Sequence, residues 1–272
     1  MFGKVCLVTG ATDGIGKETV RALAAVGATV VGVGRNPAKI KAALQDIGET
    51  SGSLEFLTAD LSSQTHIRML AEEFRRKYTR LDVLVNNAGA LFTSYRESID
   101  GIEMTFALNH LSYFLLTNLL LDLLIASAPS RIINVASDAH GGGQLNFDDL
   151  GNRRNYSGWD AYNDSKLANI MFTYELARRV EGSGVTVNAV HPGFVNSNFQ
   201  RAAGLNMRGP LSSEEGADTQ VWLAASDQVE GISGKYFVRR SETQSSEESY
   251  DQAAARRLWD ASARLVGMPV TQ

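Results

Sequence analysis

Cysteine and proline are scarce in this sequence: among 272 residues there are one cysteine, Cys6, and five prolines. A single cysteine cannot form an internal disulfide, and Cys6 lies in the apolar run Val5–Val8, where we expect a small buried side chain. This usage predicts a reduced, intracellular and cytoplasmic protein. No proline-rich linker divides the chain, so residues 1–272 are predicted to form a single domain, with a cofactor half at about 1–135 and catalytic and substrate elements at about 136–272.

Excess charge of one sign is also absent. The 26 Lys and Arg against 30 Asp and Glu give a net charge of −4, and the basic residues are scattered along the chain. A nucleic-acid partner is therefore not expected. The four histidines have no Cys or His partners at ligand spacing, so no metal site is predicted.

No run of about 20 uninterrupted apolar residues is present, so no membrane span is predicted. The most apolar segment, 111–125, is interrupted by Ser112, Thr117, Asn118 and Asp122. We interpret it as a core helix with a second apolar side that packs on another subunit, which predicts a homodimer.

Apolar, β-branched runs alternate with longer segments of helical period. This pattern is typical of α/β proteins and predicts a single Rossmann-type, doubly wound domain: a seven-stranded parallel sheet with helices on both faces. The predicted strands are 4–9, 29–34, 54–58, 82–85, 131–136, 185–190 and 235–238. The predicted helices are 14–26, 37–48, 63–78, 101–125, 159–181 and 213–225, with a last helix near 250–266.

Three glycines, Gly10, Gly14 and Gly16, lie where the first strand turns into the first helix. Glycines there let backbone N–H groups approach a pyrophosphate at the positive end of the helix dipole. The spacing is Gly-x-x-x-Gly-x-Gly, and a tight turn without a ligand is the alternative explanation.

The second strand is followed by Arg35, where many dinucleotide sites have an acidic residue for the ribose 2′-hydroxyl. A guanidinium suits a 2′-phosphate, and Lys17 is a candidate second cation. Together they predict NADP(H) as the cofactor, unless both are ordinary solvated surface charges.

Tyr162 and Lys166 are spaced i, i+4 in a predicted helix and so share one face. A nearby ammonium favours the phenolate of a tyrosine and suits it to acid–base work. An ordinary amphipathic helix gives the same spacing by chance. Ser137 favours the catalytic interpretation, because it ends a strand at the sheet edge where ligands bind and its hydroxyl can hold a substrate carbonyl.

Two further segments follow strands at that same edge. Asn86 and Asn87 precede Ala88 and Gly89 after the fourth strand and indicate a polar network beside the cofactor, although an Asn/Gly turn would look the same. Asp60–Leu61 follows the third strand, where it either flanks an adenine or caps a helix.

Six elements, in their order along the chain, resemble the motifs of the short-chain dehydrogenase/reductase family. They are residues 9–16, residues 86–89, Asn109, Ser137, the Tyr162/Lys166 pair and His191-Pro192-Gly193. The resemblance implies that Tyr162 is the general acid/base, that Lys166 holds the nicotinamide ribose and tunes the tyrosine, that Ser137 orients the carbonyl, and that Asn109 keeps a proton-relay water. It also implies that Ser197, near the end of the last motif, serves the nicotinamide carboxamide. The cofactor contacts that we expect are Gly10, Thr12, Asp13, Gly14, Ile15, Gly16, Arg35, Asp60, Leu61, Asn87, Ala88, Gly89, Tyr162, Lys166, Pro192, Gly193, Val195 and Ser197.

Three features resemble the retinol dehydrogenase branch of that family: the long segment 138–161 between Ser137 and Tyr162, the run 166–169 and the late run 255–259. That branch reduces retinal and other lipophilic aldehydes or ketones with NADPH. Many of its members begin with a hydrophobic membrane anchor, whereas this sequence begins at its first strand, so the resemblance implies the reaction type rather than retinoid specificity. The small-molecule carbonyl or alcohol substrate is expected to meet a pocket drawn from Trp159, Phe194, Phe199, Leu205, Met207 and residues 90–92, with Arg201 and Arg208 as alternative carboxylate contacts.

Other classes fit the sequence less well. His140 follows Ser137 by three residues, but no Gly-x-Ser-x-Gly surrounds the serine, which argues against a hydrolase. Protochlorophyllide reductases resemble this sequence in the general motifs, and the late Arg-Arg-Leu-Trp match favours the general reductase over them. A catalytically silent NADP-binding sensor or scaffold of the same fold would be expected to have replaced the tyrosine or the lysine.

Overall fold

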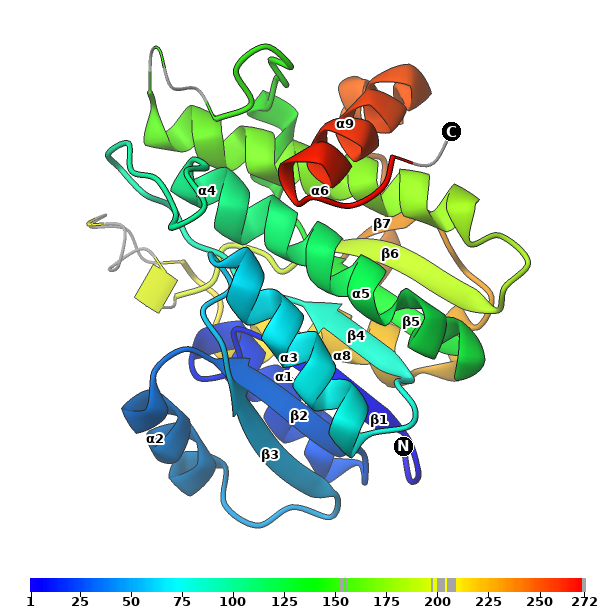
Figure 1. Cartoon of the computed structure of the whole chain (residues 1–272). Coiled ribbons are helices and arrows are strands. Elements are labelled where there is room, and N and C mark those ends of the chain that lie inside the picture. The colour runs from blue at the N-terminus through cyan, green and yellow to red at the C-terminus, as the bar shows by residue number, and fades with distance from the viewer. Residues whose placement is uncertain (152–153, 155, 197, 200–203, 205–208, 271–272) are drawn as a thin grey trace.

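The computed structural model describes residues 1–272 except 152–153, 155, 197, 200–203, 205–208 and 271–272. A single eight-stranded sheet runs through the described chain in the order β3-β2-β1-β4-β5-β6-β7-β8 (Figure 1). The strands are β1 (Val5–Thr9), β2 (Thr29–Gly34), β3 (Ser53–Thr58), β4 (Val83–Asn86), β5 (Ser130–Val135), β6 (Val185–His191), β7 (Lys235–Val238) and β8 (Ser241–Glu242). The order reverses between β1 and β4, which is the arrangement of the doubly wound fold predicted from the sequence.

Seven of these strands are parallel, as predicted, and β8 adds a short antiparallel edge. The turn into β8 is made by Arg239 and Arg240, whose φ angles are 50° and 59°. Two successive left-handed residues are the geometry of a tight hairpin. This hairpin was not predicted, because Asn-Gly or Asp-Gly usually marks such turns and two arginines do not.

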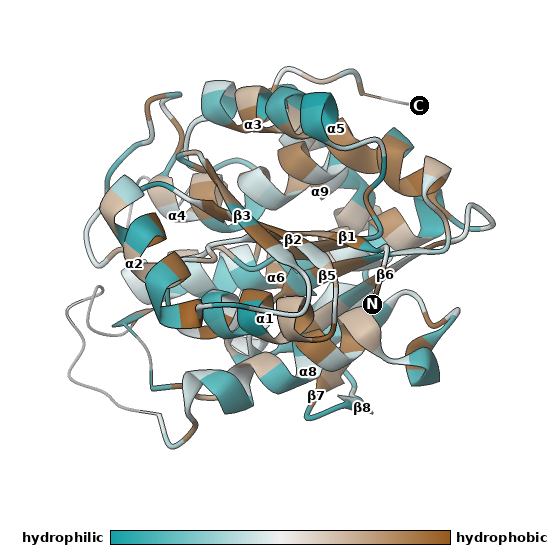
Figure 2. Ribbon diagram, turned by 90° about the horizontal axis from the view of Figure 1, so that it is seen from below, coloured by the Kyte–Doolittle hydropathy of each residue, from teal (hydrophilic) through white to brown (hydrophobic). Residues whose placement is uncertain are grey.

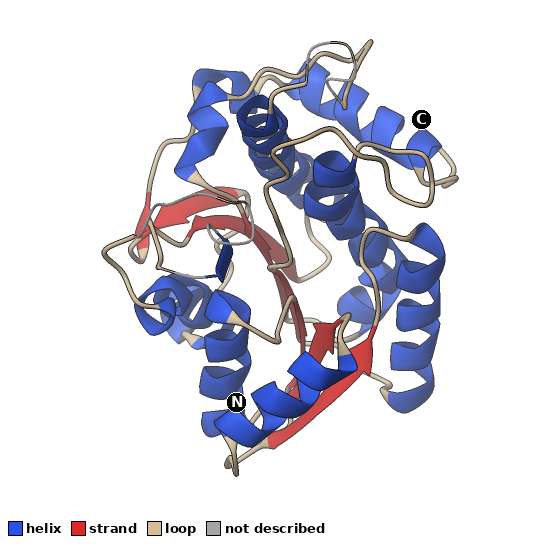
Figure 3. Ribbon diagram, turned by 90° about the vertical axis from the view of Figure 1, so that its left-hand side faces the viewer, coloured by secondary structure: helices blue, strands red, loops and turns tan. Residues whose placement is uncertain are grey.

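Helices cover both faces of the sheet (Figures 2 and 3). The helices of one hydrophobic cluster are α3 (Gln64–Lys77), α5 (Ser112–Ala126), α6 (Gly158–Arg179) and α9 (Gln252–Leu265). The other cluster buries residues of α1 (Gly14–Ala25), α2 (Pro37–Ile47) and α8 (Ser213–Ala225). Ser212 and Glu215 form a reciprocal capping box at the start of α8.

The apolar segment near residue 111 forms one continuous helical stretch, in which α4 (Met104–Phe106), a π-helical turn at Ala107–Leu111 and α5 follow one another. It begins at Met104, three residues later than predicted, because Glu103 caps the backbone N–H groups of Thr105 and Phe106. The stretch Met104–Ala126 is long and apolar enough to cross a membrane, and 61% of its most apolar window is buried inside the protein.

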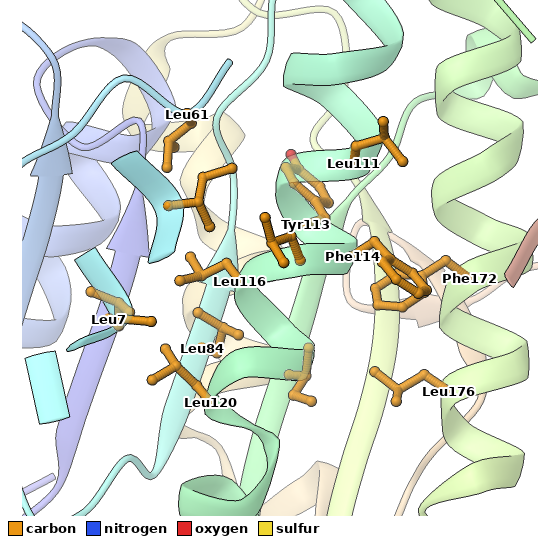
Figure 4. Packing of buried hydrophobic residues seen from close by; sticks show 14 of the residues in the cluster. Leu7, Leu61, Leu84, Leu111, Tyr113, Phe114, Leu116, Leu120, Phe172 and Leu176 are labelled. Atoms are coloured by element: carbon orange, nitrogen blue, oxygen red, sulfur yellow. The ribbon is translucent and has the colours of Figure 1, made fainter. Parts of the chain in front are cut away.

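Helix α5 is packed by elements of its own chain. Figure 4 shows Leu116 and Leu120 directed toward the sheet and Phe114 against Phe172 of α6. Trp259 of α9 contacts both phenyl rings, with centroids 4.9 and 5.8 Å away. The apolar side chains of α5 thus pack on the sheet, on α3 and, through Phe114, on α6 and α9, whereas Ile125 remains 42% exposed near the end of the helix.

Candidate active site

The loops that carry the predicted site follow the carboxyl ends of successive parallel strands, so they meet at one edge of the sheet. Gly10 follows β1, Arg35 follows β2, Asn87 follows β4, Ser137 follows β5 and Pro192 follows β6. Two adjoining cavities of about 330 and 340 Å³ lie there and share the lining residues Ile15, Asn87, Gly89 and Phe199. They form the site.

The cavity of about 330 Å³ is built around the glycine-rich turn. Its lining contains Gly10, Thr12, Asp13, Gly14, Ile15, Gly16, Arg35, Asp60, Leu61, Asn87, Ala88 and Gly89, all of which the sequence assigned to the cofactor. The side chain of Asp13 accepts a hydrogen bond from the Gly14 N–H and caps α1. The remaining N–H groups of the first helical turn have no partner within the helix, which suits a phosphate.

Glycine is required at two positions of this turn. Gly10 has a φ of +66°, and a Cβ there would lie 2.9 Å from the Ala88 Cα. A Cβ on Gly16 would lie 2.3 Å from the Gly10 oxygen and 2.5 Å from the Asn87 Nδ2. The glycines therefore let the turn pack against the loop after β4, where Asn87 donates to the Thr9 carbonyl at 2.9 Å.

Cations occupy one end of this cavity. Arg35 is exposed at the end of β2, and Lys39, in the first turn of α2, joins it in the lining. The prediction that Lys17 is the second cation was wrong: its ammonium binds Asp46 at 2.6 Å and lies outside the cavity lining. The sequence feature that could have indicated Lys39 is Asn36-Pro37. Asn36 caps α2 and Pro37 begins it directly after Arg35, so Lys39 is the third residue of the helix and lies near the cavity.

The cavity of about 340 Å³ contains the chemistry-bearing groups. Ser137, Tyr162 and Lys166 all line it, together with Pro192, Gly193 and Val195. The Ser137 hydroxyl donates to the Asp138 carboxylate at 3.1 Å and accepts from the Ala139 N–H at 3.2 Å, and Tyr162 lines the same cavity. The Lys166 Nζ donates to the Val135 carbonyl at 3.0 Å and lies 5.5 Å from the centre of the Tyr162 ring.

Burial dominates the ionisation of this group. It raises the pKa of Tyr162 to about 12; the neighbouring Ser137 hydroxyl acts to lower this pKa, and the charge of Asp138 acts to raise it. Burial also lowers the pKa of Lys166 from 10.5 to about 7. The expected lowering of the Tyr162 pKa by Lys166 is thus not seen in the protein alone. A protonated phenol is suited to giving a proton to a carbonyl oxygen.

Asn109 lies in the π-helical turn before α5 and is fully buried. Its side chain accepts from the Ala90 N–H and donates to the Ala90 carbonyl and the Ser165 hydroxyl, at 2.9 to 3.0 Å. Its backbone oxygen accepts from Asn169 at 2.9 Å. A π-turn leaves carbonyl groups without their usual helical partners and often marks functional sites. The assignment of a relay water to Asn109 stays a prediction.

Some of the predicted substrate residues line the second cavity, some do not, and others lie outside the described residues. Trp159, Phe194 and Phe199 line the second cavity, and the first two are each 44% exposed. Leu91 is instead buried in the protein, and the Phe92 ring lies against Arg96, so neither lines this cavity. Ser197, Arg201, Leu205, Met207 and Arg208 lie outside the described residues.

Sequence reasoning missed two groups that the structure brings to Ser137. His140 and His191 hydrogen-bond the backbone on either side of the Ser137–Asp138 peptide. The spacing of His140 from Ser137 matches only a hydrolase pattern, and a contact to a backbone group requires no sequence motif.

A larger hollow of about 910 Å³ lies at the opposite edge of the sheet, among residues that include Lys4, Asp82 and Arg131. None of the predicted site residues lines it. The site is thus identified by its chemistry and by the strand ends rather than by size.

Comparisons with known proteins agree with this geometry. The family model described as short chain dehydrogenase matches residues 4–207. Retinol dehydrogenase 14 of Mus musculus is 41% identical, covering 98% of this chain and 87% of its own, and retinol dehydrogenase 13 of Homo sapiens is 44% identical, covering 98% and 85%.

Solved structures are also similar. An uncharacterized protein of Mycobacterium paratuberculosis has a TM-score of 0.83 at 32% identity and covers 100% of this chain and 96% of its own. RhlG of Pseudomonas aeruginosa, solved as an active-site complex with NADP, has a TM-score of 0.72 at 28% identity and covers 87% of this chain and 94% of its own. This chain is therefore a member of the short-chain dehydrogenase/reductase family, an oxidoreductase similar to the retinol dehydrogenases.

Proposed function

We propose that this protein is an NADP(H)-dependent oxidoreductase that acts on a carbonyl/alcohol pair, with a lipophilic aldehyde or ketone as the substrate. The observation that carries the proposal is the convergence of Ser137, Tyr162 and Lys166 in a cavity that adjoins the cavity of the glycine-rich turn. Family membership gives the oxidoreductase class, and the residues around the two cavities support the finer assignments.

The residues present fit a dinucleotide with a 2′-phosphate. The first turn of α1 offers N–H groups for a pyrophosphate, and Asp60 and Leu61 flank the same cavity. Arg35 and Lys39 bring two cations to it, and no acidic residue follows directly after β2. A carboxylate at that position would repel a 2′-phosphate, whereas a guanidinium hydrogen-bonds it.

When bound, the nicotinamide supplies the hydride for reduction or accepts it for oxidation. The Ser137 hydroxyl holds the carbonyl oxygen of the substrate. Tyr162, which is protonated at neutral pH, gives its proton to that oxygen as negative charge develops there. Lys166 is held in place by the Val135 carbonyl and places its side-chain nitrogen beside the Tyr162 ring.

An apolar substrate is supported by the walls around these polar groups. Trp159, Phe194 and Phe199 surround the Tyr162 end of the cavity, and the ring centres of Trp159 and Phe199 lie 6.2 and 5.4 Å from that of Tyr162. Polarity is thus supplied at the reacting end, and hydrocarbon contact is supplied around it.

The test is oxidation of NADPH, with NADH in parallel, in the presence of a panel of aldehydes, ketones and quinones. We expect turnover with apolar carbonyl compounds and NADPH. Tight NADPH binding without turnover on any of them would favour the silent sensor over the enzyme.

We further propose that the protein is cytoplasmic and forms a homodimer through the exposed end of α5.

A further inference from the structure

Two histidines hold one peptide group from opposite sides. The His140 Nδ1 lies 2.6 Å from the Ser137 carbonyl oxygen, and the Asp138 N–H donates to the His191 Nδ1 at 3.1 Å. This carbonyl and this N–H belong to the same peptide unit. The peptide between Ser137 and Asp138 is thereby held at both its carbonyl and its N–H.

The partners of His140 determine its tautomer. The Ser137 carbonyl can only accept, so the Nδ1 of His140 carries the hydrogen. Its Nε2 accepts from the Ser246 backbone N–H at 2.9 Å, so that nitrogen is bare. The ring is neutral and both of its nitrogens are used.

The charged and titratable groups around the ring are consistent with this state. Asp138 lies in the same turn, Glu248 in the short helix Glu247–Tyr250, Tyr236 in β7 and His191 at the end of β6. Burial lowers the pKa of His140, and Asp138 and Glu248 act in the opposite direction. Because burial dominates, His140 stays neutral at physiological pH.

Ser246 belongs to the C-terminal segment 244–250, which lies beyond residues 4–207 that match the family model. This segment is held to α6 and to itself by side-chain hydrogen bonds: Tyr174 to Ser245 at 2.7 Å, and Ser245 to Ser249 at 2.6 Å. A continuous set of hydrogen bonds thus connects helix α6 and the C-terminal segment to Ser137.

We propose that His140 is a positioning residue for the reaction: with His191 it fixes the Ser137–Asp138 peptide, and through Ser246 it makes the orientation of the Ser137 hydroxyl depend on the C-terminal segment. The role of His140 in the reaction rests on the proposed function. That His140 and His191 both bind the Ser137–Asp138 peptide follows from their hydrogen bonds alone. His140 itself does not touch the substrate.

Ser246 offers a matched pair of variants. Its φ of −62° is the angle of proline, so Ser246→Pro removes the N–H that His140 accepts while keeping the backbone conformation. Ser246→Ala keeps that N–H. Both changes remove a hydroxyl that is buried without a partner among the described residues, so Ser246→Ala controls for its loss, and the two variants differ in the N–H and in the proline ring that replaces it.

Two variants of His140 separate its own two bonds. The amide nitrogen of His140→Asn can replace the Nδ1 donor to Ser137, and the longer His140→Gln can reach Ser246 in place of Nε2. We expect kcat to fall at least tenfold in His140→Gln, and threefold to tenfold in His140→Asn and Ser246→Pro. Ser246→Ala should stay within twofold of wild type. The KM for NADPH should stay within twofold in all four variants, because the cofactor's phosphate and adenine contacts are untouched.

Amide hydrogen exchange tests the hydrogen bonds of His140 directly and does not depend on enzymatic turnover. The Ser246 amide should exchange at least tenfold faster in His140→Asn than in wild type, and the Asp138 amide should exchange faster in His140→Gln. Equal kcat in Ser246→Pro and Ser246→Ala, unchanged exchange in the His140 variants, or a rise in KM that matches the fall in kcat would each overturn the proposal. If the wild-type protein turns over no carbonyl compound, the proposed function fails, and the exchange rates alone decide whether the peptide is held as described.

Discussion

Replacing Arg35 with alanine tests the cofactor assignment at a single side chain. Arg35 is exposed at the end of β2, lines the cavity of the glycine-rich turn and is joined there by Lys39. Hydrogen bonds to charged groups contribute about 1.5 to 3 kcal/mol. Because Arg35 is solvent-exposed, we expect the lower end of this range, a loss of about 1.5 kcal/mol or roughly 10-fold in NADPH affinity.

The assay is a fluorescence titration of NADPH and NADH with wild type and variants. Arg35→Ala should weaken NADPH binding and leave NADH within twofold, since NADH lacks the 2′-phosphate. Lys17→Ala is the matched control, because it removes a nearby cation that is paired with Asp46 outside the cavity lining. Equal losses for both cofactors, or a Lys17→Ala loss as large as that of Arg35→Ala, would refute the reasoning.

Three further predictions concern a buried histidine, the substrate cavity and the exposed end of α5. Burial lowers the pKa of His110 from 6.5 to about 4, so the unfolded chain takes up a proton first as the pH falls, and roughly 3 kcal/mol of stability should be lost between pH 6.5 and 4. Urea unfolding at pH 7 and 4.5 should show a smaller loss for His110→Asn than for wild type, and identical losses would contradict this. For straight-chain aldehydes, kcat/KM should rise about two- to fourfold per added CH₂ if each is buried, whereas a flat series would indicate that the cavity does not contact the chain. The homodimer predicts that wild type elutes as a dimer on a sizing column and Ile125→Asp as a monomer; a wild-type monomer at micromolar concentration would end that proposal.

Much of the fold could be predicted because the signals were local. The apolar runs gave all seven parallel strands to within one or two residues, and the glycines at positions 10, 14 and 16 placed the turn after β1. The parallel arrangement then brings Arg35, Asn87 and Ser137 to one edge without further information.

The remainder depended on contacts distant in sequence. Lys17 could be excluded only by its pairing with Asp46, and the cover of α5 by Trp259 joins segments more than 140 residues apart. His140 and Ser246 are 106 residues apart and meet through a backbone N–H, which any residue except proline would supply. A sequence pattern does not record such contacts.

The most direct test of the central claim is the turnover of Tyr162→Phe, which deletes the transferable proton and little else. The account predicts an NADPH dissociation constant within twofold of wild type and a kcat reduced at least about 100-fold, the lower range for general acid catalysis. Lys166→Ala, measured beside it, should lose both binding and rate. A Tyr162→Phe variant that keeps more than about a tenth of the wild-type kcat, a barrier change below about 1.4 kcal/mol, would contradict the account.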